Sequence, residues 1–104
     1  MYAATVTPAA TAATLRSLIN AATPGQITDI YNGRAFEVIL QWVAGTVDVN
    51  WKSGTVGAAD SGFQLSTSDR SLTLRAPVHN QLSIDDIYLS GATSPSVRVI
   101  VNIA

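Results

Sequence analysis

The chain has 104 residues and no cysteine, and its six Lys and Arg residues against seven Asp and Glu residues give a formal net charge of −1. This length holds one compact domain. Charged residues make up only 12% of the chain and hydrophobic residues 47%, which excludes a disordered charged tail and a nucleic-acid-binding protein held by phosphate contacts. The sequence has no apolar run long enough to span a membrane, and without cysteine it can form neither disulfides nor thiolate metal sites.

Residues 1–13 consist almost entirely of Ala and Thr. They lack the basic start and leucine-rich core of a secretory signal. Two interpretations remain open for this N-terminal arm. It is either a poorly ordered terminus or an extended segment that becomes ordered on a neighbouring subunit.

The next segment carries a helical pattern, with apolar residues spaced along one stripe. These are Leu15, Leu18, Ile19 and Ala22. The spacing predicts a short helix over 14–22, with Thr11 or Thr14 as its N-cap and Thr23-Pro24-Gly25 as its stop. A helix this short needs an apolar surface to pack on, and the open end of a β-sandwich would provide one.

Beyond the helix the apolar residues recur with a period of two, which is typical of strands. The alternation predicts strands near 35–43, 46–52, 63–66, 71–76, 82–89 and 97–103. Ala44-Gly45 is predicted as a hairpin turn and 91–96 as a second turn. The pattern changes parity at Asp85-Asp86, where a bend would bring both Ile84 and Ile87 into the core. The predicted fold is an all-β antiparallel β-sandwich with a short N-terminal helix, forming one domain over 14–104.

The sequence contains no recognisable catalytic motif. His79 is the only histidine, it lies in a predicted turn, and no G-x-S-x-G nucleophile elbow accompanies it. Asp85 and Asp86 are adjacent, so in extended chain they point to opposite sides and form neither a carboxylate pair nor a calcium loop. We therefore expect no enzymatic activity, no cofactor and no metal. For Trp42 and Trp51 two interpretations stay open: a pair of core side chains or a stacking platform for sugar rings.

The surface is predicted to be poor in charge and rich in small residues. Thirteen charged residues cannot cover a domain of this size, and such a surface suits close contact with other proteins. Arginine outnumbers lysine five to one and is enriched at protein interfaces. We select Arg34, Arg70 and Arg75 as candidate partner-binding residues. The alternative is a soluble monomer with a hydroxyl-rich surface.

The C-terminal part of the chain resembles the small virion proteins of tailed bacteriophages. The resemblance rests on Ser61-Gly62-Phe63-Gln64-Leu65, Ser71-Leu72-Thr73-Leu74-Arg75-Ala76, the segment LSIDDIYL at 82–89 and VRVIV at 97–101. It implies a jelly-roll-like sandwich acting as a capsid cement or decoration protein, without catalytic residues. The implied partners are the major capsid protein and further copies of the chain as a homo-oligomer. The implied location is the capsid surface of the virion, after synthesis in the host cytoplasm. A minor tail or head-completion protein and, from another class, a carbohydrate-binding or adhesive module are the alternatives.

Overall fold

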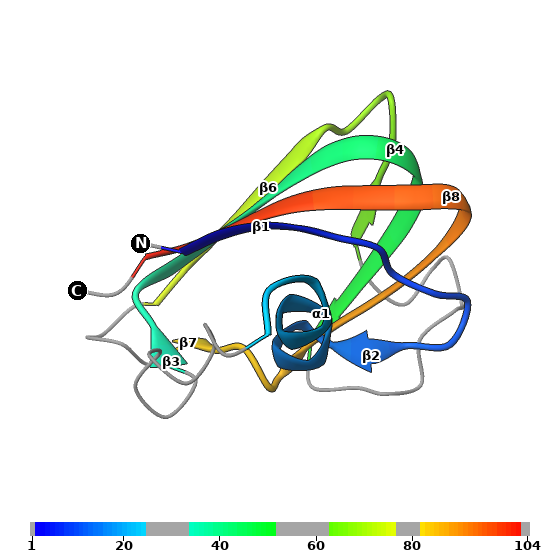
Figure 1. Ribbon diagram of the computed structural model, residues 1–104. Helices are drawn as coiled ribbons and strands as arrows, with labels where there is room; N and C mark the ends of the chain where they lie inside the picture. The colour runs from blue at the N-terminus through cyan, green and yellow to red at the C-terminus, as the bar shows by residue number, and fades with distance from the viewer. Residues whose placement is uncertain (1, 25–33, 52–62, 77–81, 103–104) are drawn as a thin grey trace.

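The structure is a computed structural model, and it describes residues 2–24, 34–51, 63–76 and 82–102. These residues form a mostly β fold with one short helix (Figure 1). In chain order the elements are β1 (Tyr2–Val6), β2 (Ala13–Thr14), α1 (Leu15–Ala22), β3 (Arg34–Ala35), β4 (Glu37–Trp51), β5 (Phe63–Leu65), β6 (Ser71–Arg75), β7 (Leu82–Ser83) and β8 (Ile87–Asn102).

Two long strands, β4 and β8, form the centre of a six-stranded antiparallel sheet. They pair with each other along nearly their whole lengths, from Glu37 opposite Asn102 to Trp51 opposite Ile87. The outer edge of β8 holds β1 and, further along, β2. The outer edge of β4 holds β6 and, further along, β5. At each end of the central pair, four strands therefore lie side by side. We call the four strands β1-β8-β4-β6 the first arm and the four strands β2-β8-β4-β5 the second arm.

The sheet turns a corner between the two arms, and Figure 1 shows β4 and β8 arching over together at this point. The pairing register shifts between Trp42 and Ala44 and again between Ala44 and Thr46. Gly45 has a φ of 71°, and on β8 Thr93 and Ser94 have φ values of 63° and 54°. Left-handed backbone inside a strand pair is the mark of a β-bulge, which bends the strands and increases their twist.

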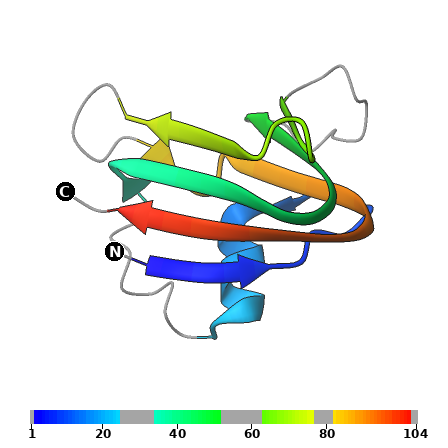
Figure 2. The ribbon, with the colours of Figure 1, turned by 90° about the horizontal axis from the view of Figure 1, so that it is seen from above.

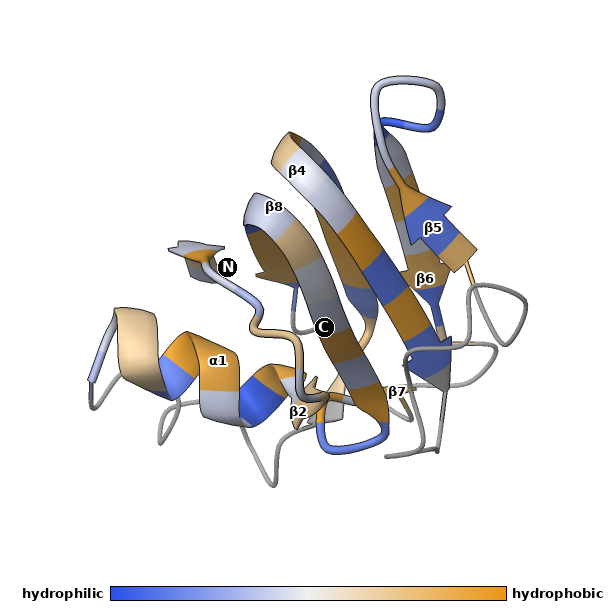
Figure 3. Cartoon of the chain, turned by 90° about the vertical axis from the view of Figure 1, so that its right-hand side faces the viewer, coloured by the Kyte–Doolittle hydropathy of each residue, from blue (hydrophilic) through white to orange (hydrophobic). Residues whose placement is uncertain are grey.

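The inner face of the bent sheet holds the hydrophobic core. The first arm contributes Val6, Val38, Leu40, Val97, Val99 and Val101, and the second arm contributes Val47, Val49, Leu65, Ile87 and Leu89. Because the corner brings the inner faces of both arms into one cluster, a single sheet buries side chains as two packed sheets would. Figure 3 shows the alternation of apolar and polar residues along β4 that this one-sided burial requires.

Helix α1 packs its apolar stripe into this core. Leu15 and Ile19 are buried, and Leu18 packs against the cluster. The Thr14 hydroxyl accepts a hydrogen bond from the Ser17 amide as the N-cap, which confirms one of the two predicted caps. The helix ends at the predicted stop, where the Thr23 amide donates to the Ile19 carbonyl.

The coarse prediction of an antiparallel β fold with a short N-terminal helix is confirmed. The described residues contain one open sheet of six strands, and a two-stranded ladder of β3 and β7 beside it. No second full sheet that would make a sandwich lies among them. The bend at Asp85-Asp86 is also confirmed, because Ile84 and Ile87 are both buried.

Two predicted turns are wrong. Ala44-Gly45 does not reverse the chain, and residues 91–96 do not separate two strands; both lie inside the continuous strands β4 and β8. Gly45 has left-handed backbone, and that conformation serves a bulge as well as a hairpin. Asn50 and its neighbour Val49 are both buried, so β4 is covered on both faces near its end.

We expect Gly45→Ala to destabilise the fold strongly. A Cβ at this position would lie 2.7 Å from the Ala92 carbonyl oxygen and from the Pro95 Cα, and alanine is strained at this φ. Strain and overpacking together are expected to lower the free energy of unfolding by about 2–4 kcal/mol, measured by urea denaturation. The control Gln41→Ala, exposed on the same strand, is expected to stay within about 0.5 kcal/mol of the parent. Equal stability of the two variants would contradict the constrained corner.

Candidate partner-binding surface

The outer face of the first arm is open, and it carries three charged side chains among eleven. Register places its side chains in rows across the four strands. These side chains are Ala3, Thr5, Glu37, Ile39, Gln41, Ser71, Thr73, Arg75, Arg98, Ile100 and Asn102. Ile39 and Ile100 lie directly opposite each other on the two central strands and are only half-buried. The outer face thus has an apolar centre, with polar and charged side chains beside it on the two central strands and small side chains on most of the two edge strands.

Two of its three charged side chains neutralise each other. The Arg75 Nη2 and Nε both donate to Glu37 Oε2, at 2.6 and 3.1 Å. Asn102 Nδ2 donates to the other carboxylate oxygen at 2.9 Å. The hydrogen bond from Arg75, followed by the one from Asn102, lowers the pKa of Glu37 below its ordinary value. Within the described part of the chain, Arg98 is the remaining charge on this face.

Arg70 lies at one end of β6 and covers the Trp42 ring. Its guanidinium carbon is 5.5 Å from the ring centroid, and its Nε donates to the Thr67 carbonyl. The indole Nε1 of Trp42 donates to the Gly45 carbonyl at 2.7 Å. The ring is thereby fixed at the corner of the sheet, with one face occupied by an arginine.

Arg75 lies at the other end of β6, 5.9 Å from the centroid of the Phe36 ring. Phe36 is 37% exposed, and Val43, near the corner, is 50% exposed. Each end of the β6 edge therefore presents an arginine stacked on an aromatic ring. Arginine and aromatic side chains are enriched among the residues that contribute most to protein–protein binding.

Two of the three predicted partner-binding arginines, Arg70 and Arg75, have described side chains. Arg70 and Arg75 flank the same strand. The backbone of Arg34 pairs with Ser83 in the two-stranded ladder, and its side chain lies outside the described residues, as does that of Trp51. His79 also lies outside the described residues.

The adjacent carboxylates have separate environments. Asp85 accepts hydrogen bonds from Arg16 Nε and Nη2 at 2.6 and 3.0 Å, which ties the turn before β8 to helix α1. Asp86 contributes its amide to a turn with the Ser83 carbonyl. Among the described residues no group of three or more His, Cys, Asp and Glu side chains is placed to hold a metal ion.

A scan against protein-family models and searches of curated proteins and of solved structures found no match. No helix in the described ranges is long and apolar enough to cross a membrane.

The sequence alone did not indicate the exposure of Phe36 or the strand β1. Phe36 falls within the predicted strand 35–43, yet it lies exposed at a bend just before β4. Residues 2–6 were predicted as an arm, and the structure pairs them with β8 of the same chain. The signal for this strand was weak because the small residues Ala3, Ala4 and Thr5 separate Tyr2 from Val6.

We expect Glu37→Gln to reduce the dependence of stability on acid pH. A carboxyl group with a lowered pKa contributes stability that is complete above its ordinary pKa of about 4.3 and is lost as the pH falls through the lowered value. The parent should therefore lose more of its free energy of unfolding than Glu37→Gln between pH 5 and pH 3, measured by urea denaturation at each pH. Arg75→Gln should have the same effect, and Ser71→Ala on the same strand should leave the parent profile. A parental profile in both charge variants would contradict the role of this cluster.

Proposed function

We propose that this protein is a structural, non-enzymatic component of a virion, a capsid cement or decoration protein that binds and stabilises the shell of the major capsid protein. In this proposal it acts as a homo-oligomer at the capsid surface after synthesis in the host cytoplasm, without a cofactor. In this proposal, the two arms of the bent sheet take the place of the two sheets of the jelly-roll-like sandwich that the sequence resemblance implies. Nucleic acid and membrane are not among its proposed partners.

The observation that carries the proposal is the open outer face of the first arm. A sheet face exposed to water is ordinarily polar in alternation with its buried face. Here Ile39 and Ile100 occupy its centre, and its small side chains lose little conformational entropy in a contact. A flat surface of this kind supports many shallow contacts to a protein lattice, where repeated copies add avidity.

A carbohydrate-binding module is the less favoured alternative. A sugar platform needs an exposed aromatic face, and Arg70 covers one face of Trp42 while the indole N–H is already used. Titration with a glycan panel while tryptophan fluorescence is followed distinguishes the two functions. Unchanged emission is expected here, and a saturable change would favour the sugar-binding function.

We expect Ile100→Lys to weaken binding to capsid shells at least about tenfold, which corresponds to about 1.4 kcal/mol. The ammonium group would have to lose its hydration in the contact. Shells lacking this protein are mixed with each purified variant, and the bound fraction is measured by co-sedimentation, with electron microscopy of the occupied shells.

Asn20→Lys provides the matched control, because it adds the same charge on the exposed side of α1 and should bind as the parent does. Thermal melting establishes that both variants remain folded. Parental binding by Ile100→Lys would remove the outer face from the contact. Failure of the parent to bind any shell, or binding to tails alone, would overturn the cement function.

A further inference from the structure

The first arm ends in two strand edges that face no further strand among the described residues. One is the edge of β1 along Ala3–Val6, and the other is the edge of β6, Ser71–Arg75. Natural proteins protect such edges with charges, prolines or bulges. Neither strand contains a proline, β1 has no charged residue, and the charge of Arg75 at the end of β6 is neutralised by Glu37.

The two edges match each other in direction. Each strand in the series β1, β8, β4, β6 is antiparallel to its neighbour, so β1 and β6 run in opposite directions. A second copy shifted sideways, without being turned over, therefore places its β6 antiparallel to β1 of the first copy. Figure 2 shows the four strands side by side, with β1 and β6 at the two edges.

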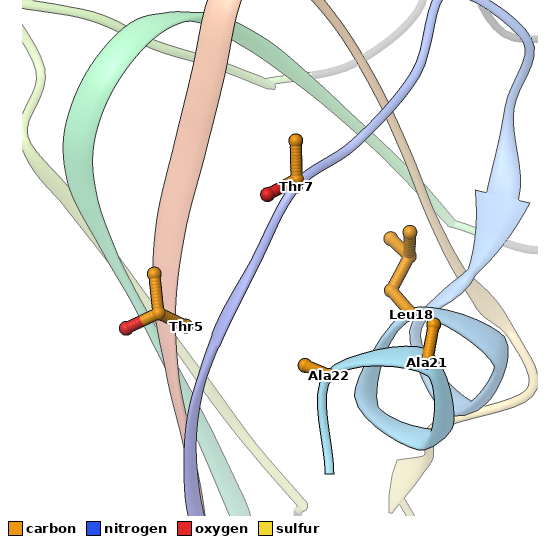
Figure 4. A pocket seen from close by; sticks show the side chains of 5 residues that line it. All are labelled: Thr5, Thr7, Leu18, Ala21 and Ala22. Atoms are coloured by element: carbon orange, nitrogen blue, oxygen red, sulfur yellow. The ribbon is translucent and has the colours of Figure 1, made fainter. Parts of the chain in front are cut away.

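The space beside β1 has a lining of small and apolar side chains that could accommodate apolar side chains of another strand. Figure 2 shows α1 crossing beneath β1, with its last turn beyond the edge of the sheet. A hollow of about 270 Å³ lies there between the strand and the helix (Figure 4). Its lining residues are Thr5, Thr7, Leu18, Ala21 and Ala22.

We propose that β6 of a second copy pairs with β1 and covers this hollow, so that copies join head to tail into a continuous sheet. Inner-face residues must meet inner-face residues, and the hollow lies near Thr5 and Thr7. One register satisfies both of these conditions. It places Leu72 of the second copy opposite Val6, and Thr73 of the second copy opposite Thr5. Leu72 and Leu74 are half-buried in a single copy and would become covered.

Charge and area determine what kind of assembly this pairing gives. The arginine at the end of β6 brings its own counter-charge, Glu37. Strand β1 itself has no charged residue, and the like charge nearest to it is Arg98, opposite Thr5 on β8. A strand of five residues is about 17 Å long and a sheet layer about 10 Å thick, so one junction has a cross-section on the order of 170 Å². That is less than a stable dimer buries. A stable assembly therefore needs junctions at both edges of each copy. The twist of the sheet curls such a series of joined copies into a ring or a helix.

This inference deepens the proposed function by naming how copies contact one another, and its test uses no shells. Since the chain has no cysteine, Thr5→Cys and Thr73→Cys can be introduced together and oxidised mildly. Opposite residues of an antiparallel pair lie within disulfide range. Within one copy the two positions are three strand spacings apart, about 14 Å, so they cannot bridge. Non-reducing electrophoresis should show a ladder of linked copies.

The control variant combines Thr5→Cys with Ser68→Cys, an exposed position outside β6. It should cross-link at least about tenfold more slowly than the Thr5→Cys, Thr73→Cys variant. A mixture of the two single variants should stop at dimers. Absence of a ladder, or an equal rate in the control, would overturn the proposal. Rapid dimers of Thr5→Cys alone would mean that β1 pairs with β1, which also overturns it. Failure of the parent to bind any shell, together with an intact ladder, would overturn the proposed function and leave this inference standing.

Discussion

The corner in the β4–β8 pair is the constraint on which the rest of the structure depends. Only one face of this six-stranded sheet carries the core side chains. If the sheet were flat, much of that face would be exposed to water. The corner folds the face onto itself, so Val38 and Leu40 of one arm join Val47 and Val49 of the other in a single core. The conformation of Gly45 makes this possible, because no other residue adopts its φ at the same contacts without strain.

The corner also determines which edges of the sheet remain available. The second arm ends in β2 and β5, which have two and three residues, and short edges offer little for another strand to pair with. The first arm ends in β1 and β6, with five residues each. The bend therefore places both longer edges and the open outer face on the same arm. The proposed contacts between copies and the proposed contacts with a lattice would then use different parts of this arm.

The sequence predicted what local patterns determine and missed what depends on long-range pairing. The helix stripe of Leu15 and Ile19 and the bend before Ile87 follow from nearest neighbours in the chain, and both predictions were right. Ala44-Gly45 was misread because a left-handed glycine occurs in hairpins and in bulges alike. Only the partner strand decides between them, and here the extra residues at Thr93 and Ser94 lie some fifty positions away. For the candidate site, Arg70 and Arg75 were selected by residue type, but their stacking on Trp42 and Phe36 needs the β4–β6 register.

The low charge of the chain becomes interpretable once the ion pairs are located. Arg16 is used to tie α1 to the turn at Asp85, and Arg75 is used to hold Glu37. These paired charges hold secondary-structure elements in place. They do little to prevent association with other proteins, because each is neutralised by its partner. A monomer that must remain dispersed needs unpaired charges on its open sheet face and on its edges, since these are the surfaces most prone to association. On that face this chain places Ile39 and Ile100 at the centre, with Arg98 as the one charge outside the Glu37–Arg75 pair among the described residues, and it places Ala and Thr along one edge. This distribution is consistent with the proposed contact with other protein surfaces.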